Sequence, residues 1–238
     1  MAELEHHPHE HQLQEQHRRD HADATDCGAD RFSAARQAAD WDDRYREKDG
    51  AIWSGEPNGR LVLEVGDLVP GRALDVGCGE GADAIWLAQR GWDVTAVDVS
   101  PLAVERARAA GARAGVVVDW VCDDVLAAPF PPDSFDLVSL QYPALPKAAG
   151  DLALRALLDA MRPDGVLLAV YHDLDAEHRA LMATRGFDPA DYVLDAEFRA
   201  LLAVADDFTV ELDAVEPRVD PPGDNPHIAD VVLRARRR

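Results

Sequence analysis

Five residues between positions 75 and 98 have the types and spacing of a nucleotide-binding turn. Asp75, Gly77, Gly79 and Gly81 follow a short apolar run, and Asp98 ends the next apolar run. This order predicts a strand, a glycine-rich turn, a helix and a second strand with an acid at its tip. Glycines let the backbone approach a ligand and let the helix N-terminus face it. A carboxylate at the second strand's end accepts hydrogen bonds from ribose hydroxyls. The pattern therefore predicts a site for an adenosine-containing cofactor.

The rest of the chain alternates between strand and helix patterns. We predict strands at 73–76, 93–97, 116–122, 135–140, 166–171, 209–215 and 229–234. We predict helices at 32–48, 61–68, 82–90, 151–161 and 196–204, and a further one begun by Ser100-Pro101, with a turn at 162–165. Such alternation indicates an α/β, doubly wound, Rossmann-like sheet. The last two strands follow each other without a helical pattern, so we expect a closing antiparallel hairpin, giving seven strands in a mixed sheet.

Several segments resemble one enzyme family. Asp-Val-Gly-Cys-Gly-Glu-Gly, beginning at Asp75, resembles motif I of the class I S-adenosylmethionine (SAM)-dependent methyltransferases. The segments 122–125, 129–138 and 162–168 resemble further motifs of that family, in the expected order. The resemblance covers about Trp41 to Arg238 and implies the class I methyltransferase fold with SAM as cofactor. The glycine run also fits a looser dinucleotide pattern, but such folds usually carry an apolar residue where this chain has Asp75.

The resemblance implies roles around the glycine turn. Asp75 and the backbone around Gly77 and Gly79 would hold the methionine ammonium and the ribose side of SAM. Asp98 would bind the ribose 2′ and 3′ hydroxyls. Cys78 lies within this cofactor-binding turn, where we interpret it as a small turn residue rather than a nucleophile. Acids here suit a cofactor that carries positive charge, whereas NAD carries a pyrophosphate anion.

Other matching positions would contact adenine or cover the cofactor. Asp124 aligns with the acid that accepts the adenine amino group, and Asp123 stands where relatives often have glycine. Val125 would pack on the adenine face, and Val99 either does the same or belongs to the core. Trp53 is a further candidate contact to the cofactor. The segment from Trp41 to Asn58 resembles the small-molecule branch of the family with thiopurine- and tellurite-type detoxifying enzymes, in which a tryptophan-containing segment covers the cofactor.

The loop after the fourth strand faces the transferred methyl group in this family. Gln141 and Tyr142 are therefore the candidate catalytic residues on the acceptor side, and Gln141 is also a candidate cofactor contact. Ordinary loop residues would give the same pattern. His172 could act as a base, although a histidine without a visible partner is more often structural.

The amino-terminal residues predict a separate segment. Residues 1–30 contain six histidines among polar residues, which predicts a disordered arm, with a weak metal-binding tract as the alternative. Residues 31–238 would form the methyltransferase domain, with 31–70 as an N-terminal lid segment.

The composition of the chain limits the kinds of partner that we expect for this protein. The formal net charge of −21 argues against nucleic acid, and the basic cluster at 234–238 is interpreted as a solvated tail. We find no apolar run long enough to cross a membrane and no secretory signal. Three scattered cysteines fit a reducing cytoplasm, and the residue usage suggests a bacterial source.

We therefore expect a cytoplasmic SAM-dependent methyltransferase, a monomer or homodimer without a bound metal, acting on a small molecule with a soft sulfur, selenium or tellurium atom or a phenolic oxygen. The alternatives are an NAD-dependent oxidoreductase and a non-enzymatic metal-binding protein that uses the histidine arm.

Overall fold

The computed structural model describes residues 32–48, 50–128, 130–147, 151–184, 188–219 and 228–238. The predicted arm at 1–30 lies outside these residues. The strands are β1 (Arg72–Val76), β2 (Asp93–Asp98), β3 (Asp119–Cys122), β4 (Phe135–Gln141), β5 (Met161–His172), β6 (Phe208–Pro217) and β7 (Ala229–Arg237). The helices are α2 (Ala34–Arg46), α3 (Gly59–Val65), α4 (Ala82–Gln89), α5 (Pro101–Ala114), α6 (Leu152–Ala160), α7 (Ala176–Thr184), the 3-10 helix η2 (Pro189–Asp191) and α8 (Asp195–Val204).

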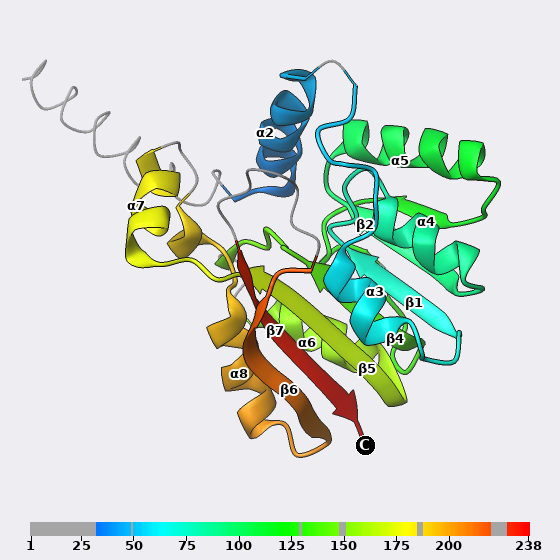
Figure 1. Ribbon diagram of the computed structural model, residues 1–238, viewed down its shortest axis with the longest axis vertical. Helices are drawn as coiled ribbons and strands as arrows, with labels where there is room; N and C mark the ends of the chain where they lie inside the picture. Colours follow the sequence, from blue (N-terminus) through cyan, green and yellow to red (C-terminus); the bar gives the residue numbers. More distant parts are fainter. Residues whose placement is uncertain (1–31, 49, 129, 148–150, 185–187, 220–227) are drawn as a thin grey trace, which may run out of the picture.

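All seven strands form one sheet in the order β3-β2-β1-β4-β5-β7-β6 (Figure 1). The strands β1 to β5 run parallel to one another. The strand β7 lies antiparallel between β5 and β6, so the chain ends in the predicted antiparallel hairpin. This order confirms the seven-stranded, doubly wound α/β fold.

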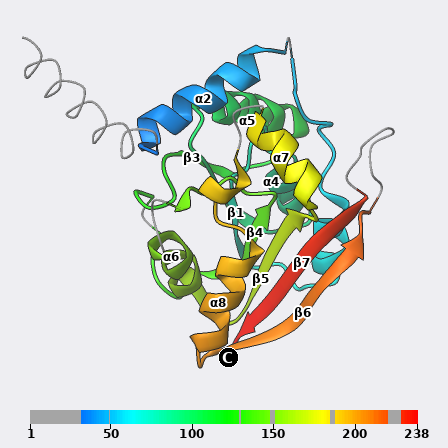
Figure 2. The same ribbon diagram turned by 90° about the vertical axis from the view of Figure 1, so that its left-hand side faces the viewer.

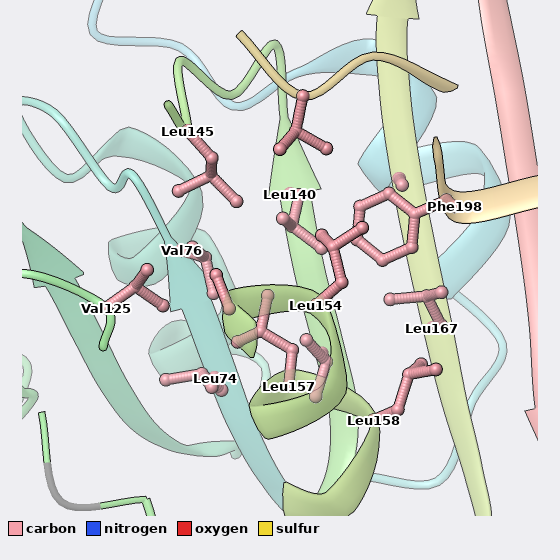
Figure 3. Packing of buried hydrophobic residues seen from close by; sticks show 14 of the residues in the cluster. Leu74, Val76, Val125, Leu140, Leu145, Leu154, Leu157, Leu158, Leu167 and Phe198 are labelled. Atoms are coloured by element: carbon pink, nitrogen blue, oxygen red, sulfur yellow. The ribbon is translucent and has the colours of Figure 1, made fainter. Parts of the chain in front are cut away.

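Helices cover both faces of the sheet (Figures 1 and 2). The larger core cluster joins α6 and α8 to the face that carries Leu74 and Val76 (Figure 3). The second cluster joins α3 and α4 to the face that carries Ala73. Because side chains alternate along a strand, Asp75 lies on the α3 and α4 face. The same alternation places Gln141, which follows Leu137 by four residues, on that face.

The third and fifth strands differ most from the prediction at their first residues. The third strand begins at Asp119 rather than Val116, because Gly115 ends α5 in the left-handed region and Val117 is 92% exposed. The predicted turn at 162–165 lies inside β5, because Met161 already pairs with Phe135, and an irregularity follows in the ladder. The backbone bends there at Asp164, whose φ is +67°.

Other differences from the prediction concern the helices and the C-terminal arginines. The helix predicted at 61–68 is α3, which begins two residues earlier and ends at Val65, while α7 and η2 were not predicted from periodicity. The basic cluster at the C-terminus is no solvated tail, because it belongs largely to β7. There Arg234 and Arg236 both form ion pairs with Glu211 of β6.

Candidate functional site

The glycine-rich turn is fixed to the end of β2. The backbone N–H groups of Gly77 and Cys78 both donate to the Val97 carbonyl, at 2.8 and 3.0 Å. Gly77 and Gly79 have φ values of +71° and +53°, a region that residues with a Cβ rarely adopt. A Cβ at Gly77 would meet nothing within 4 Å. The turn therefore exposes backbone to open space at the carboxyl edge of the sheet.

Asp98 connects this turn to the start of α5. Its Oδ2 accepts from the Gly79 N–H at 2.8 Å, and its Oδ1 accepts from the Ser100 N–H at 2.9 Å. Burial raises the pKa of Asp98, the two backbone bonds counteract that rise, and Asp42 adds to it. The carboxylate lies at the end of β2, and its role as the ribose-binding acid stays a prediction.

Asp75 is buried without a counter-ion. Its side chain is 2% exposed, and its Oδ2 has no hydrogen-bond partner. Burial, followed by the nearby carboxylates of Asp83 and Asp98, raises the pKa of Asp75, and a hydrogen bond from the Ala84 N–H opposes the rise. A buried carboxylate oxygen without a donor is costly unless a ligand supplies one. Its chemistry fits an ammonium group.

Cys78 does not have the surroundings of a nucleophile. It is 8% exposed, and burial, then Asp75 and Asp98, raises the pKa of its thiol. A reactive cysteine needs a lowered pKa and access to solvent. Cys78 is a buried member of the core on the α3 and α4 face.

The N-terminal segment is attached above the glycine turn. Asp42 of α2 accepts from the Ser100 hydroxyl at 2.5 Å and from the Leu102 N–H at 3.1 Å, next to the start of α5. Glu80, within the turn, accepts from the Trp53 N–H at 3.1 Å and pairs with Arg106 at 2.9 Å.

Two aromatic side chains of this segment lie over Gly79. The Trp53 Nε1 donates to the Tyr45 hydroxyl at 3.3 Å. A Cβ built on Gly79 would be 3.1 Å from that hydroxyl and 3.4 Å from Nε1. Trp53 thus lies beside the glycine turn. Its contact with the cofactor and the role of residues 31–70 as a lid stay predictions.

The predicted adenine-side residues follow β3. The Asp123 N–H donates to the Asp98 carbonyl at 3.2 Å, and Asp124 Oδ1 accepts from the Leu126 N–H at 3.1 Å. Val125 is 7% exposed and packs in the larger core cluster, and Val99 is half-buried. Their predicted contacts with adenine stay predictions.

Gln141 and Tyr142 lie at the carboxyl end of β4. Gln141 is 9% exposed, donates from Nε2 to the Ser139 hydroxyl at 3.1 Å, and leaves Oε1 without a partner. Tyr142 has a φ of +53°, which is strained for a residue with a side chain. Its ring stacks on His172, with centroids 4.2 Å apart, and Arg218 lies 4.8 Å from its centroid.

The sequence reasoning missed Asp230 and Arg218 beside this pair. Asp230 is fully buried on β7, directly opposite His172 on β5. The Arg218 Nη1 is 3.3 Å from His172 Nδ1. One signal was available, since Asp230 opens an apolar strand pattern in which an acid has no structural reason to be buried.

The donor set fits SAM. Asp75 Oδ2 and Gln141 Oε1 are buried without a hydrogen-bond partner and could each accept from a ligand donor, and Gly77 leaves room for a ligand beside the backbone. In the part of the chain that the structure describes, no group of three or more His, Cys, Asp or Glu side chains could hold a metal ion. Within the same residues, no helix has the length and apolar character to cross a membrane.

The chain has the fold of the class I SAM-dependent methyltransferases. Residues 73–165 match the family described as "Methyltransferase domain". The chain is 37% identical over 107 residues to the ubiquinone biosynthesis O-methyltransferase of Xanthomonas euvesicatoria. The aligned segment covers 42% of this chain and 43% of that protein. The chain spans less than half of the length of the first curated relatives it matches.

Solved structures show the same fold. One is described as "Conversion of a Disulfide Bond into a Thioacetal Group during Echinomycin Biosynthesis" and matches with a TM-score of 0.65 and 26% identity, covering 84% of this chain and 93% of that one. The magnesium protoporphyrin IX methyltransferase of Synechocystis PCC 6803 with bound SAH has a TM-score of 0.58 and 18% identity, covering 88% of this chain and 97% of that one.

Proposed function

We propose that this protein transfers the methyl group of SAM to a small-molecule acceptor whose nucleophile is a soft sulfur, selenium or tellurium atom or a phenolic oxygen. The observation that carries the proposal is Asp75, a buried acid with an unpaired oxygen beside a glycine turn that leaves open space. A cation satisfies this acid, whereas the pyrophosphate of NAD would be repelled by it. The antiparallel β7 also differs from the continued βαβ units of a dinucleotide-binding fold.

Each part of the cofactor has a candidate partner. Asp75 would accept from the methionine ammonium, and Asp98 would accept from the ribose hydroxyls while it holds the Gly79 N–H. Asp124 and Val125 would contact adenine. Tyr45 and Trp53 would cover the cofactor from the N-terminal segment and exclude water.

The acceptor would lie against Tyr142, His172 and Arg218. SAM supplies an activated methyl group on a sulfonium when it is bound, so the protein's part is to orient the acceptor. Burial, followed by Asp230, raises the pKa of Tyr142, so its hydroxyl stays protonated at neutral pH. Tyr142 would therefore position the acceptor together with Gln141 rather than remove its proton, which suits a thiolate or another nucleophile that is already deprotonated.

Two similar proteins support this class of acceptor. One is named as an O-methyltransferase of ubiquinone biosynthesis, and the other is described by the conversion of a disulfide into a thioacetal. The thiopurine- and tellurite-type branch is proposed from the segment between Trp41 and Asn58, in which Trp53 reaches Tyr45 over the glycine turn.

The test is calorimetric titration with S-adenosylhomocysteine (SAH), with NADH in parallel. We expect SAH alone to bind. Labelled SAM is then incubated with dithiothreitol, thiophenol or catechol, and we expect label to appear in at least one of these acceptors. Asp98→Asn should weaken SAH binding, whereas the matched Asp119→Asn, at an exposed position of β3, should not. Binding of NADH without SAH would contradict the proposal.

A further inference from the structure

A second carboxylate lies beside Asp75 at the start of α4. Asp83 is in the first turn of α4 and is 7% exposed. Asp75 accepts a hydrogen bond from the N–H of the next residue, Ala84, so its carboxylate reaches the same turn. Two carboxylates, each more than nine-tenths buried, thus meet where the glycine loop enters the helix.

The two acids differ in their partners. Asp83 Oδ1 accepts from the Asn58 N–H, and its Oδ2 accepts from Asn58 Nδ2, both at 2.7 Å. Burial raises the pKa of Asp83, and the bonds to both of its oxygens oppose that rise and favour the ionised form. Asp75 has no donor on Oδ2. Asn58 comes from the N-terminal segment, which therefore fixes the orientation of Asp83.

No cation is among the groups that shift Asp75. The charged groups that face it are Asp83 of α4 and Asp98 of β2. The Cys78 thiol of the turn is near enough to Asp75 for the two groups to influence each other. On β4, the residue that pairs in register with Asp75 is Ser139. The charge of Asp83 also acts on Tyr142, as one of the causes that raise the pKa of that tyrosine after its burial. Two adjacent buried carboxylates without a cation do not both ionise.

We propose that Asp75 and Asp83 form a two-carboxylate ammonium site, oriented by Asn58, which holds one proton when empty and releases it when the cofactor's ammonium binds. This inference rests on the proposed function. The proton is on Asp75, because Asn58 satisfies both oxygens of Asp83. The ammonium takes the place of that proton at Asp75 Oδ2, so charge at the site is conserved.

The exchange gives cofactor affinity a defined pH dependence. Below the pKa of Asp75 in the free protein, each bound ammonium must displace a proton. Affinity therefore rises with pH and becomes constant once Asp75 is ionised before binding. A ligand that reaches Asp98 but lacks the ammonium should not follow this rise.

The test is calorimetric titration of the full chain with SAH in phosphate and in Tris, two buffers with different ionisation enthalpies. The difference in measured heat gives the number of protons released. We expect about one proton per SAH bound. The matched probe is 5′-methylthioadenosine, which keeps the adenine and ribose but has no ammonium, and it should release none. SAH binding with the same heat in both buffers would overturn the inference and leave the proposed function intact. Absence of SAH binding would instead contradict the proposed function.

Variants locate the proton. Asp75→Asn should bind SAH more weakly and without proton release, and Asp119→Asn should release protons as the wild type does. Asn58→Ala removes the side-chain Nδ2 donor to Asp83 Oδ2 and keeps the backbone N–H donor to Oδ1, so it should change the pH at which affinity becomes constant. Proton release that persists in a folded Asp75→Asn variant would overturn the inference. If that variant does not fold, the comparison of SAH with 5′-methylthioadenosine on the wild type still decides.

Discussion

The acids on two regions of the sheet have opposite surroundings. At the carboxyl ends of β1 and β2, Asp75 and Asp98 are faced by other carboxylates and by backbone N–H groups. On the closing hairpin, Glu211 of β6 pairs with Arg234 at 3.0 Å and with Arg236 at 2.5 Å. Arg237 likewise reaches Asp207 at 3.1 Å.

This difference in charge compensation distinguishes acids that serve ligand binding from acids that only support the fold. Acids that are matched by arginines need no ligand, and their partly exposed pairs contribute little each. Buried acids without a cation lower the stability of the empty protein, which a cationic ligand then restores. The location of uncompensated charge therefore marks the cofactor site more clearly than the number of acids does.

The largest expected effect comes from the glycine turn between the two strands that carry the uncompensated acids Asp75 and Asp98. Gly81 has a φ of +87°, and a Cβ there would lie 2.7 Å from the Trp120 ring and 2.9 Å from Ala107. Gly81→Ala should lower the free energy of unfolding by about 2–5 kcal/mol, from backbone strain and overpacking together. Chemical denaturation measures the loss.

Gly77→Ala is the matched control for the turn. Its φ is +71°, but its Cβ would meet open space, so only the strain of about 1–2 kcal/mol remains. Equal losses in the two variants would show that packing against Trp120 does not support the turn.

The next effect concerns the ribose-side acid. Asp98→Ala removes the acceptor for the Gly79 and Ser100 N–H groups as well as the predicted ribose contacts. We expect SAH affinity to fall by about 1.5–3 kcal/mol, the value of hydrogen bonds to a charged acceptor. Titration calorimetry measures it, and an unchanged dissociation constant would contradict the site assignment.

The pH dependence of the free energy of unfolding tests whether the acids at the carboxyl ends of β1 and β2 lack a counter-ion. The pKa of Asp75 is raised in the folded protein, mainly by burial. Its contribution to stability is therefore present below the unfolded pKa and is lost as pH rises through the folded pKa. Without ligand, the wild type should lose stability relative to Asp75→Asn as pH rises over that window. Thermal unfolding at a series of pH values tests this, and parallel curves would contradict it.

The smallest effect is expected on the hairpin. Arg236→Ala removes the pair with Glu211, whose side chains are 33% and 30% exposed. The free energy of unfolding should fall by about 0.2–1 kcal/mol. Because salt screens exposed charges, the difference should shrink at high ionic strength. A loss that salt does not reduce would show that Arg236 acts through packing instead.

Local patterns made much of the fold predictable. The alternation of strands and helices, the glycine turn and the N-cap at Ser100, which accepts from the Ala103 N–H at 3.1 Å, depend on residues close in sequence. The C-terminal hairpin was also predicted, because no helical pattern separates its strands. The first residues of β3 and β5 were predicted wrongly. They depend on the left-handed conformation of Gly115 and on the pairing of Met161 with Phe135, which the tertiary structure determines.

Contacts across the chain were not predictable. Asn58 reaches Asp83 over 25 residues, and Asp42 reaches Ser100 over 58. The alternation of β7 could have placed Asp230 on one face of the sheet, but only the pairing of β7 with β5 brings it opposite His172. Spacing along a chain carries no information on such pairs.

The sequence by itself was enough to predict the cofactor side, because a glycine turn and an acid at a strand end are local features with a fixed spacing. Only the tertiary structure decided which acids have counter-ions. It placed the arginines of β7 against β6 and left Asp75 beside Asp83 without one. Charge compensation depends on which side chains meet in space, and strand order and helix packing determine that.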